Sequence, residues 1–172
     1  RDSEYAQALR STDLGRQVRS GEVALTAAAA TLLYDPPAKL QAATPALTDS
    51  VAARLLAAAV ATQTEMLIVS PYFVPSSEGV DLMCALQRRG AQVRVLTNSL
   101  ASTDQPLVHS GYRRYRLPLL EAGAELYELS AVKANRKGRR LLFGASVGGL
   151  HAKAVLIDRQ GAFIGSMNFD PR

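Results

Sequence analysis

Met66-Leu-Ile-Val-Ser70 is an uninterrupted apolar run that Pro71 ends. Such a run predicts a strand buried on both faces of a sheet. Two further strands and two helices with glycine just beyond their ends follow, in the order strand, helix, strand, helix, strand. This order predicts an α/β fold, a three-layer α/β/α sandwich with a mixed, mostly parallel sheet. The later elements are expected at residues 80–89 (helix), 92–97 (strand), 106–122 (helix) and 125–129 (strand).

The part of the chain before this strand is less regular. Residues 1–47 are expected to be a lead-in segment, with a short amphipathic helix over Ser3–Arg19 that Gly21 ends. Thr48 is a plausible N-cap for a helix over Asp49–Thr62, because its hydroxyl can accept a bond from a first-turn N–H. We therefore expect a packed catalytic domain over residues 48–172.

Composition excludes several classes of protein. The 172 residues are 48% hydrophobic and 20% charged, which suits one globular domain and excludes a collagen or a coiled coil. One cysteine, Cys84, cannot form an intrachain disulfide or a zinc site built on several cysteines. The aliphatic stretch Val51–Ala61 is far shorter than the ~20 residues that cross a bilayer.

Positive charge is concentrated in the C-terminal third of the chain, although the net charge is only +5. Such a cluster suits anionic partners, either phospholipid headgroups or nucleic acid, and is equally compatible with a solvated basic loop. The cluster consists of Lys133, Arg136, Lys137, Arg139 and Arg140.

Chemistry-bearing residues gather in the last part of the chain. Two strand-like runs, 150–158 and 162–168, are joined by a tight turn at residues 159–161. Alternation places His151 and Lys153 on one face of the first strand, and Ser166 and Asn168 on one face of the second. If the strands pair, a nucleophile and several donors meet in one pocket, as a phosphodiester substrate requires.

These residues spell His-x-Lys-x4-Asp-x6-Gly-Ser-x-Asn, and the chain resembles the phospholipase D superfamily, whose hallmark this motif is. Residues 48–172 are further similar to the C-terminal half of bacterial cardiolipin synthase-like proteins. Segments that carry this second resemblance include Ser70-Pro-Tyr-Phe-Val-Pro75, Leu96-Thr-Asn-Ser99, His109-Ser-Gly-Tyr112, Leu126-Tyr-Glu-Leu129 and Asn168-Phe-Asp-Pro-Arg172.

The resemblance implies a reaction without metal or cofactor. His151 would attack phosphorus and form a phosphohistidine, while Lys153, Ser166 and Asn168 would stabilise charge on the phosphate oxygens. Asp158, the third letter of the motif, is expected to hold the turn rather than to act on substrate. The implied substrate is an anionic phospholipid, at the periphery of the bacterial inner membrane, with water or a lipid hydroxyl as acceptor.

Family enzymes carry two such motifs, whereas His109 is followed by Ser-Gly and is no second copy. The family's partner histidine and a glutamate that orients the motif histidine are absent from this segment. We therefore expect the segment alone to be inactive and to need an N-terminal half with a second motif. Two alternatives remain: a nuclease or phosphodiesterase that assembles one motif per chain into a homodimer, and a non-catalytic module that binds lipid or nucleic acid.

Other residues are weaker candidates. Tyr72, Phe73, Asn98 and His109 could line a pocket, since they lie at or after strand ends or near a helix start. Gly144-Ala-Ser146-Val-Gly148 matches the nucleophile elbow of serine hydrolases, but no acid lies between it and His151, so the glycines more plausibly bend the chain.

Overall fold

A computed structural model describes residue 7 and residues 10–36, 50–130 and 149–170 of the 172-residue chain. It divides into two compact units, residues 1–34 and 35–172. In the first unit, helix α2 (Asp13–Ser20) begins after Thr12, whose side chain accepts the Gly15 N–H, and ends at Gly21 with φ +73°. The expected end at Gly21 is confirmed, and the uninterrupted helix begins later than the expected Ser3.

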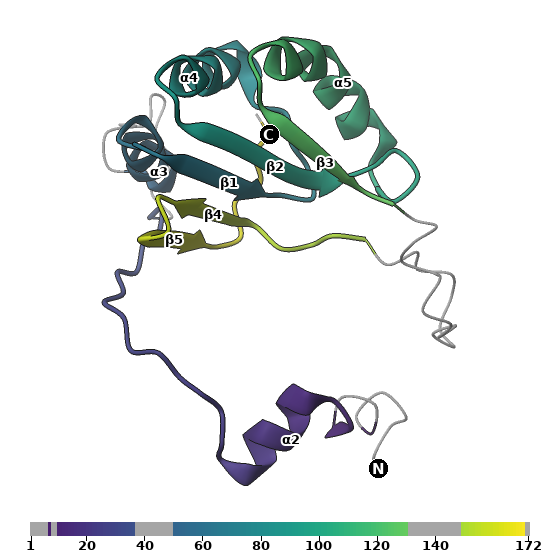
Figure 1. The fold of residues 1–172 in the computed structure, drawn as a ribbon. Coiled ribbons are helices and arrows are strands. Elements are labelled where there is room, and N and C mark those ends of the chain that lie inside the picture. Colours follow the sequence, from purple (N-terminus) through teal and green to yellow (C-terminus); the bar gives the residue numbers. More distant parts are fainter. Residues whose placement is uncertain (1–6, 8–9, 37–49, 131–148, 171–172) are drawn as a thin grey trace. The chain divides into compact units, whose positions relative to one another are not determined.

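The second unit contains one five-stranded sheet with the order β3-β2-β1-β4-β5 (Figure 1). Strands β1, β2 and β3 are parallel, whereas β4 pairs antiparallel with both β1 and β5. The predicted α/β fold with a mixed sheet is confirmed, and of the two helix layers expected, the described residues form one. The strands are β1 (Glu65–Val69), β2 (Gln92–Asn98), β3 (Glu125–Leu129), β4 (Ala154–Ile157) and β5 (Gly161–Ile164).

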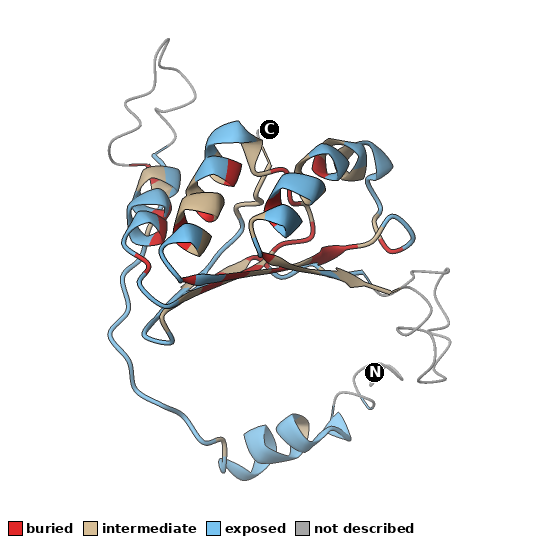
Figure 2. Ribbon diagram, turned by 45° about the horizontal axis from the view of Figure 1, so that its top comes forward, coloured by how far each residue is buried: buried red, intermediate tan, exposed pale blue. Residues whose placement is uncertain are grey.

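Three helices of this unit lie on one face of the sheet, as Figures 1 and 2 show for the described residues. They are α3 (Val51–Val60), α4 (Ser76–Arg88) and α5 (Pro106–Glu121). Helices α4 and α5 are followed by Gly90 and Gly123, whose φ angles of +89° and +94° explain why glycine stands there. Helix α4 begins four residues earlier than the sequence predicts.

Helix α3 begins at a different cap from the one expected. Ser50, not Thr48, is the N-cap, and its Oγ accepts the Ala53 N–H at 3.1 Å. Thr48 lies outside the described residues. Both positions carry a hydroxyl that suits an N-cap, and the local sequence did not distinguish them.

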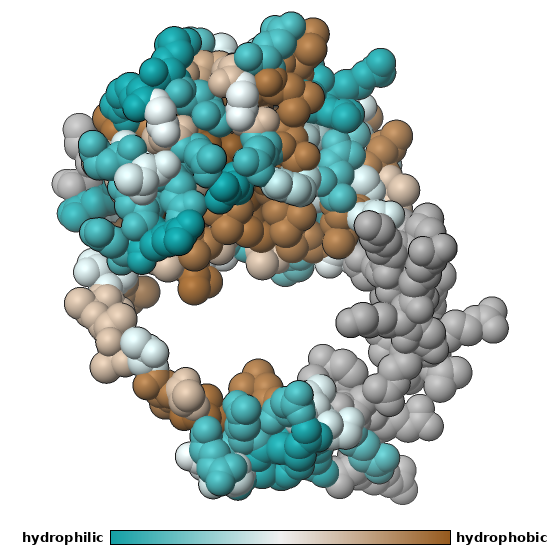
Figure 3. Space-filling view, in the orientation of Figure 1, coloured by the Kyte–Doolittle hydropathy of each residue, from teal (hydrophilic) through white to brown (hydrophobic). Residues whose placement is uncertain are grey.

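Alternate residues of the strands build the core under the helices. Met66 and Ile68 of β1, Val93 and Val95 of β2, and Val155 of β4 are buried there. The prediction that β1 is buried on both faces is wrong, because Glu65, Leu67 and Val69 on its other face are only partly buried. In Figure 3, brown apolar residues also reach the surface along the sheet.

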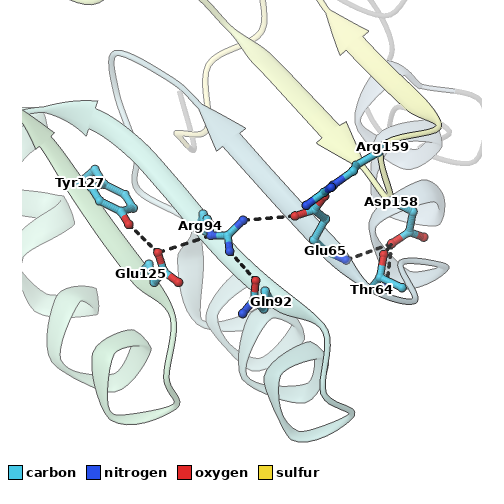
Figure 4. Close-up of polar contacts among 8 residues, drawn as sticks. All are labelled: Thr64, Glu65, Gln92, Arg94, Glu125, Tyr127, Asp158 and Arg159. Carbon is cyan, nitrogen blue, oxygen red and sulfur yellow. Dashed lines mark hydrogen bonds and ion pairs between the residues drawn. The ribbon is translucent and has the colours of Figure 1, made fainter.

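The face of the sheet away from the helices carries a row of polar contacts, shown in Figure 4. Arg94 of β2 contacts Glu65 of β1 at 3.1 Å and Glu125 of β3 at 3.4 Å, and Arg159 also contacts Glu65. Hydrogen bonding from Arg159 holds the pKa of Glu65 below its ordinary value. Charged side chains thus link neighbouring strands on this face.

Candidate functional site

Four polar motif residues, His151, Lys153, Ser166 and Asn168, converge on one open hollow of about 660 Å³. His151 and Lys153 reach it from the segment that enters β4, and Ser166 and Asn168 from the segment that leaves β5. The predicted convergence therefore exists, built from two antiparallel neighbouring segments. Its lining is completed by Ala152, Ala154, Ile164 and Gly165.

The four side chains do not lie on strands, contrary to the expectation. Strand β4 begins only at Ala154, and β5 ends at Ile164. The Gly165 N–H still bonds the Lys153 carbonyl oxygen at 3.1 Å, but four residues later Phe169 forms a bridge with Phe73 instead. The chain thus leaves the hairpin after Gly165 and crosses towards the end of β1, which opens the hollow.

Lys153 and His151 contact each other directly. Lys153 Nζ lies 3.4 Å from His151 Nε2 and donates to the His151 carbonyl oxygen at 2.8 Å. An ammonium only donates, so a bond between these groups requires Nε2 to carry the lone pair. Lys153 is 9% exposed whereas His151 is exposed, so a buried cation lies beside an imidazole that solvent reaches.

Asn168 has a side-chain oxygen that accepts no hydrogen bond from the described residues. Its Oδ1 is buried and, within the described part of the chain, has no hydrogen-bond partner. Ser166, two residues earlier, is exposed at the same hollow. A buried polar atom without a partner is costly, so a bound water or ligand that pairs with it would be favoured.

Asp158 lies at the other end of β4 from the hollow. Its carboxylate accepts the backbone N–H groups of Gln63, Thr64 and Glu65 at 2.7–3.2 Å, together with the Thr64 hydroxyl. Figure 4 shows the contacts of Asp158 with Thr64 and Glu65. These bonds hold the pKa of Asp158 far below its ordinary value, chiefly through the Thr64 N–H. Asp158 thus ties the β4–β5 turn to the loop between α3 and β1.

That turn uses a backbone conformation that is unusual for its residues. Asp158 and Arg159 have φ angles of +53° and +56°, in the left-handed region. The turn covers residues 158–160, because Gly161 already belongs to β5. Two successive positive φ angles match the twist of a tight hairpin. Because non-glycine residues adopt this conformation at a cost, the hydrogen bonds to Asp158 stabilise the turn.

The other candidate residues gather around a different, small cavity of about 10 Å³, lined by Tyr72, Phe73, Asn98 and His109 among others. Phe73 is 1% exposed and packs against Tyr112 and Phe169, and the Tyr72 hydroxyl donates to Asp104 at 2.6 Å. The His109 ring meets Tyr112 edge-on at 5.5 Å. Asn98 reaches the segment that enters β4, by bonds to Leu150 that no local sequence pattern signals.

Two sequence features lie outside the described residues: the basic cluster Lys133–Arg140 and the segment Gly144–Gly148. Among the residues that are described, no group of three or more His, Cys, Asp or Glu side chains could hold a metal ion. In the same residues, no helix combines the length and the hydropathy that crossing a bilayer requires.

Comparison with known proteins identifies the family. A family model described as cardiolipin synthase, PLD-like domain, matches residues 55–172. The chain belongs to this phospholipase D-like family. It is 37% identical to cardiolipin synthase C of Escherichia coli over 171 residues, which are 98% of this chain and 36% of that protein. It is 29% identical to cardiolipin synthase A of Yersinia pseudotuberculosis over 69% of this chain and 21% of that protein.

A solved structure supports the fold of this phospholipase D-like domain. The phospholipase D family member Nuc of Salmonella typhimurium superposes with a TM-score of 0.51 at 17% sequence identity. The match covers 71% of this chain and 66% of that one. The motif recognised in the sequence and the fold of the second unit therefore agree.

Proposed function

We propose that this chain supplies one half of the active site of a bacterial phosphatidyltransferase that joins anionic phospholipids into a cardiolipin-type product. The observation that carries the proposal is the convergence of His151, Lys153, Ser166 and Asn168 on one open hollow. An imidazole, an ammonium, a hydroxyl and a carboxamide are the groups that attack on phosphorus and stabilisation of its oxygens require.

In the first step, His151 Nε2 attacks phosphorus and forms a P–N bond, while the bond from phosphorus to the headgroup oxygen breaks. The departing alkoxide takes a proton from a general acid. In the second step, the hydroxyl of an acceptor lipid attacks phosphorus and gives up its proton to the same group. The P–N bond then breaks and His151 is restored.

Lys153 stabilises both transition states. Its Nζ–H groups already reach the His151 carbonyl oxygen and ring. An ammonium has three N–H donors, so one remains for a phosphate oxygen. Ser166 and Asn168 would donate to the same oxygens from the other side of the hollow.

The general acid is proposed to come from outside this chain. The only other histidine is His109, which lines the small cavity rather than the hollow. The chain also covers only 36% of the length of cardiolipin synthase C. We therefore propose that a segment with a second copy of the motif completes the site, and that the whole protein acts peripherally at a bacterial inner membrane.

The test is an assay of the complete protein on vesicles of phosphatidylglycerol. We expect a cardiolipin-type lipid and released glycerol, and a loss on the order of 10³-fold or more in His151→Gln. Gln160→Ala, in the β4–β5 turn, should leave the rate unchanged. Absence of lipid products, combined with nicking of DNA by a His151-dependent dimer, would replace this proposal with the nuclease alternative.

A further inference from the structure

Asn98 ends strand β2, is 3% exposed, and uses its whole carboxamide in hydrogen bonds. Its Oδ1 accepts the Leu150 N–H at 2.9 Å, and its Nδ2 donates to the Leu150 carbonyl oxygen at 3.1 Å. Nδ2 also donates to the Pro71 carbonyl oxygen at 3.3 Å. A side chain thus holds both backbone groups of Leu150 as a neighbouring strand would.

The orientation of this carboxamide is fixed by its partners. The atom facing the Leu150 N–H must accept, and the atom facing two carbonyl oxygens must donate. Ser102 Oγ lies 3.3 Å from Asn98 Oδ1 and donates to the Leu129 carbonyl oxygen at 2.9 Å. The network therefore links Leu150 to residues at the carboxyl ends of β1, β2 and β3.

His151 follows Leu150 directly and lies outside regular pairing. Strand β4 begins only at Ala154, so strand pairing does not hold the backbone of residues 150–152. The bond from the Gly165 N–H holds Lys153 on one side of His151, and Asn98 holds Leu150 on the other. The proposed nucleophile therefore stands between two fixed points of the backbone.

We infer that Asn98 is a positioning residue for His151: its carboxamide fixes the Leu150 backbone and thereby the place from which the imidazole enters the hollow. This inference rests on the proposed role of His151 as nucleophile. Asn98 does not line the hollow, so it acts through the backbone rather than on substrate. Its removal should therefore change the rate of the chemical step more than substrate binding.

The experiment compares Asn98→Ala with Thr97→Val in the complete protein. Thr97 is the adjacent buried residue, and its Oγ1 bonds the Pro71 carbonyl oxygen at 3.4 Å without reaching Leu150 in any described contact. We expect kcat to fall on the order of 10²-fold in Asn98→Ala with KM within about threefold, and to change less than about twofold in Thr97→Val. Asn98→Asp keeps the acceptor but turns a carboxylate oxygen towards two carbonyl oxygens, so kcat should fall at least as far as in Asn98→Ala.

Two measurements without substrate accompany the kinetics. Exchange of the Leu150 amide should be at least ~10-fold faster in Asn98→Ala, and the His151 ring resonances should shift, whereas Thr97→Val changes neither. Unchanged exchange and resonances, or an unchanged kcat despite faster exchange, would overturn the inference. If no form of the protein, wild type included, transfers lipid, the proposed function fails, while these two measurements still decide whether Asn98 positions His151.

Discussion

The burial and the contacts of Lys153 restrict what its ammonium group can do. Its stem is buried, and its Nζ is placed between the His151 ring nitrogen and the His151 carbonyl oxygen. An ammonium so placed favours the tautomer in which Nε2 carries no proton, and it can also donate to a phosphate oxygen. Of the described residues that line the hollow, Lys153 is the one lysine or arginine, and its ammonium lies beside the His151 ring.

Removing this charge gives the first prediction. Lys153→Met should lower kcat/KM for lipid transfer by on the order of 10²- to 10³-fold, because a donor to the phosphate oxygens is lost in the transition state. Arg113→Met removes one exposed cation from helix α5 and should leave kcat/KM unchanged. Equal effects of the two substitutions would mean that only the overall charge of the protein matters.

Asp158 gives a prediction for stability rather than rate. Because its pKa is depressed in the folded state, its stabilising effect is present above the unfolded pKa of about 4 and is lost as the pH falls towards the folded value. Asp158→Asn should therefore lower the Tm at pH 7. The difference from wild type should shrink as the pH falls below about 4. Thermal unfolding across this range measures it, and a difference that does not depend on pH would contradict the account.

At the residue scale, the motif letters could be read from the sequence, but their contacts could not. His151, Lys153, Ser166 and Asn168 are recognisable by their spacing and meet at one hollow. Asp158 bonds residues more than 90 positions earlier in the chain, and Asn98 bonds a residue 52 positions later. Neither partner leaves a local signal, since the contacts arise only from the pairing of distant strands.

At the scale of single elements, the hydrophobic periodicity predicted the middle of each helix and strand better than its first and last residues. Strand β3 has the expected bounds, and α5 and β2 differ from expectation by one residue each. Strands β4 and β5 are shorter than the alternating sequence suggests. The pattern continues past the last paired residues, because alternation reports which side is buried and not where hydrogen bonding stops.

The start of α3 provides a quantitative test. Ser50→Ala removes the bond to the Ala53 N–H and should cost about 1 kcal/mol of the unfolding free energy of the sheet-containing unit. Denaturant unfolding followed by a probe in that unit measures the loss. Thr12→Ala removes the corresponding cap of α2 in the first unit and should leave that transition unchanged. An equal loss in both variants would show that the two units unfold together.

At the scale of the whole molecule, strand and helix order predicted the parallel half of the sheet. The addition of β4 beside β1, antiparallel to it, depends on contacts between residues 66–69 and 154–157. The order of the elements in the sequence does not fix the position of β4. That position, in turn, places the motif segments at the edge of the sheet where β1 and β2 end. The sheet thereby brings Asn98 from β2 to the segment before β4.

Whether this chain suffices for activity depends on where the general acid lies in the whole protein. A general acid contributes on the order of 10²- to 10⁴-fold, and His109 lies at another cavity. The isolated 172-residue chain should therefore transfer phosphatidyl groups at least ~10²-fold more slowly than the complete protein. Equal rates on phosphatidylglycerol vesicles would contradict the need for a second motif-bearing segment.

The most direct measurement traps the covalent intermediate. Complete protein is mixed with phosphatidylglycerol, quenched under conditions that preserve phosphohistidine, digested and mapped by mass spectrometry. The account predicts a phosphatidyl group on the peptide containing His151, attached to that residue, and its loss in His151→Gln. Attachment to another residue of this chain, with His151 unmodified, would contradict the assignment of His151 as the nucleophile.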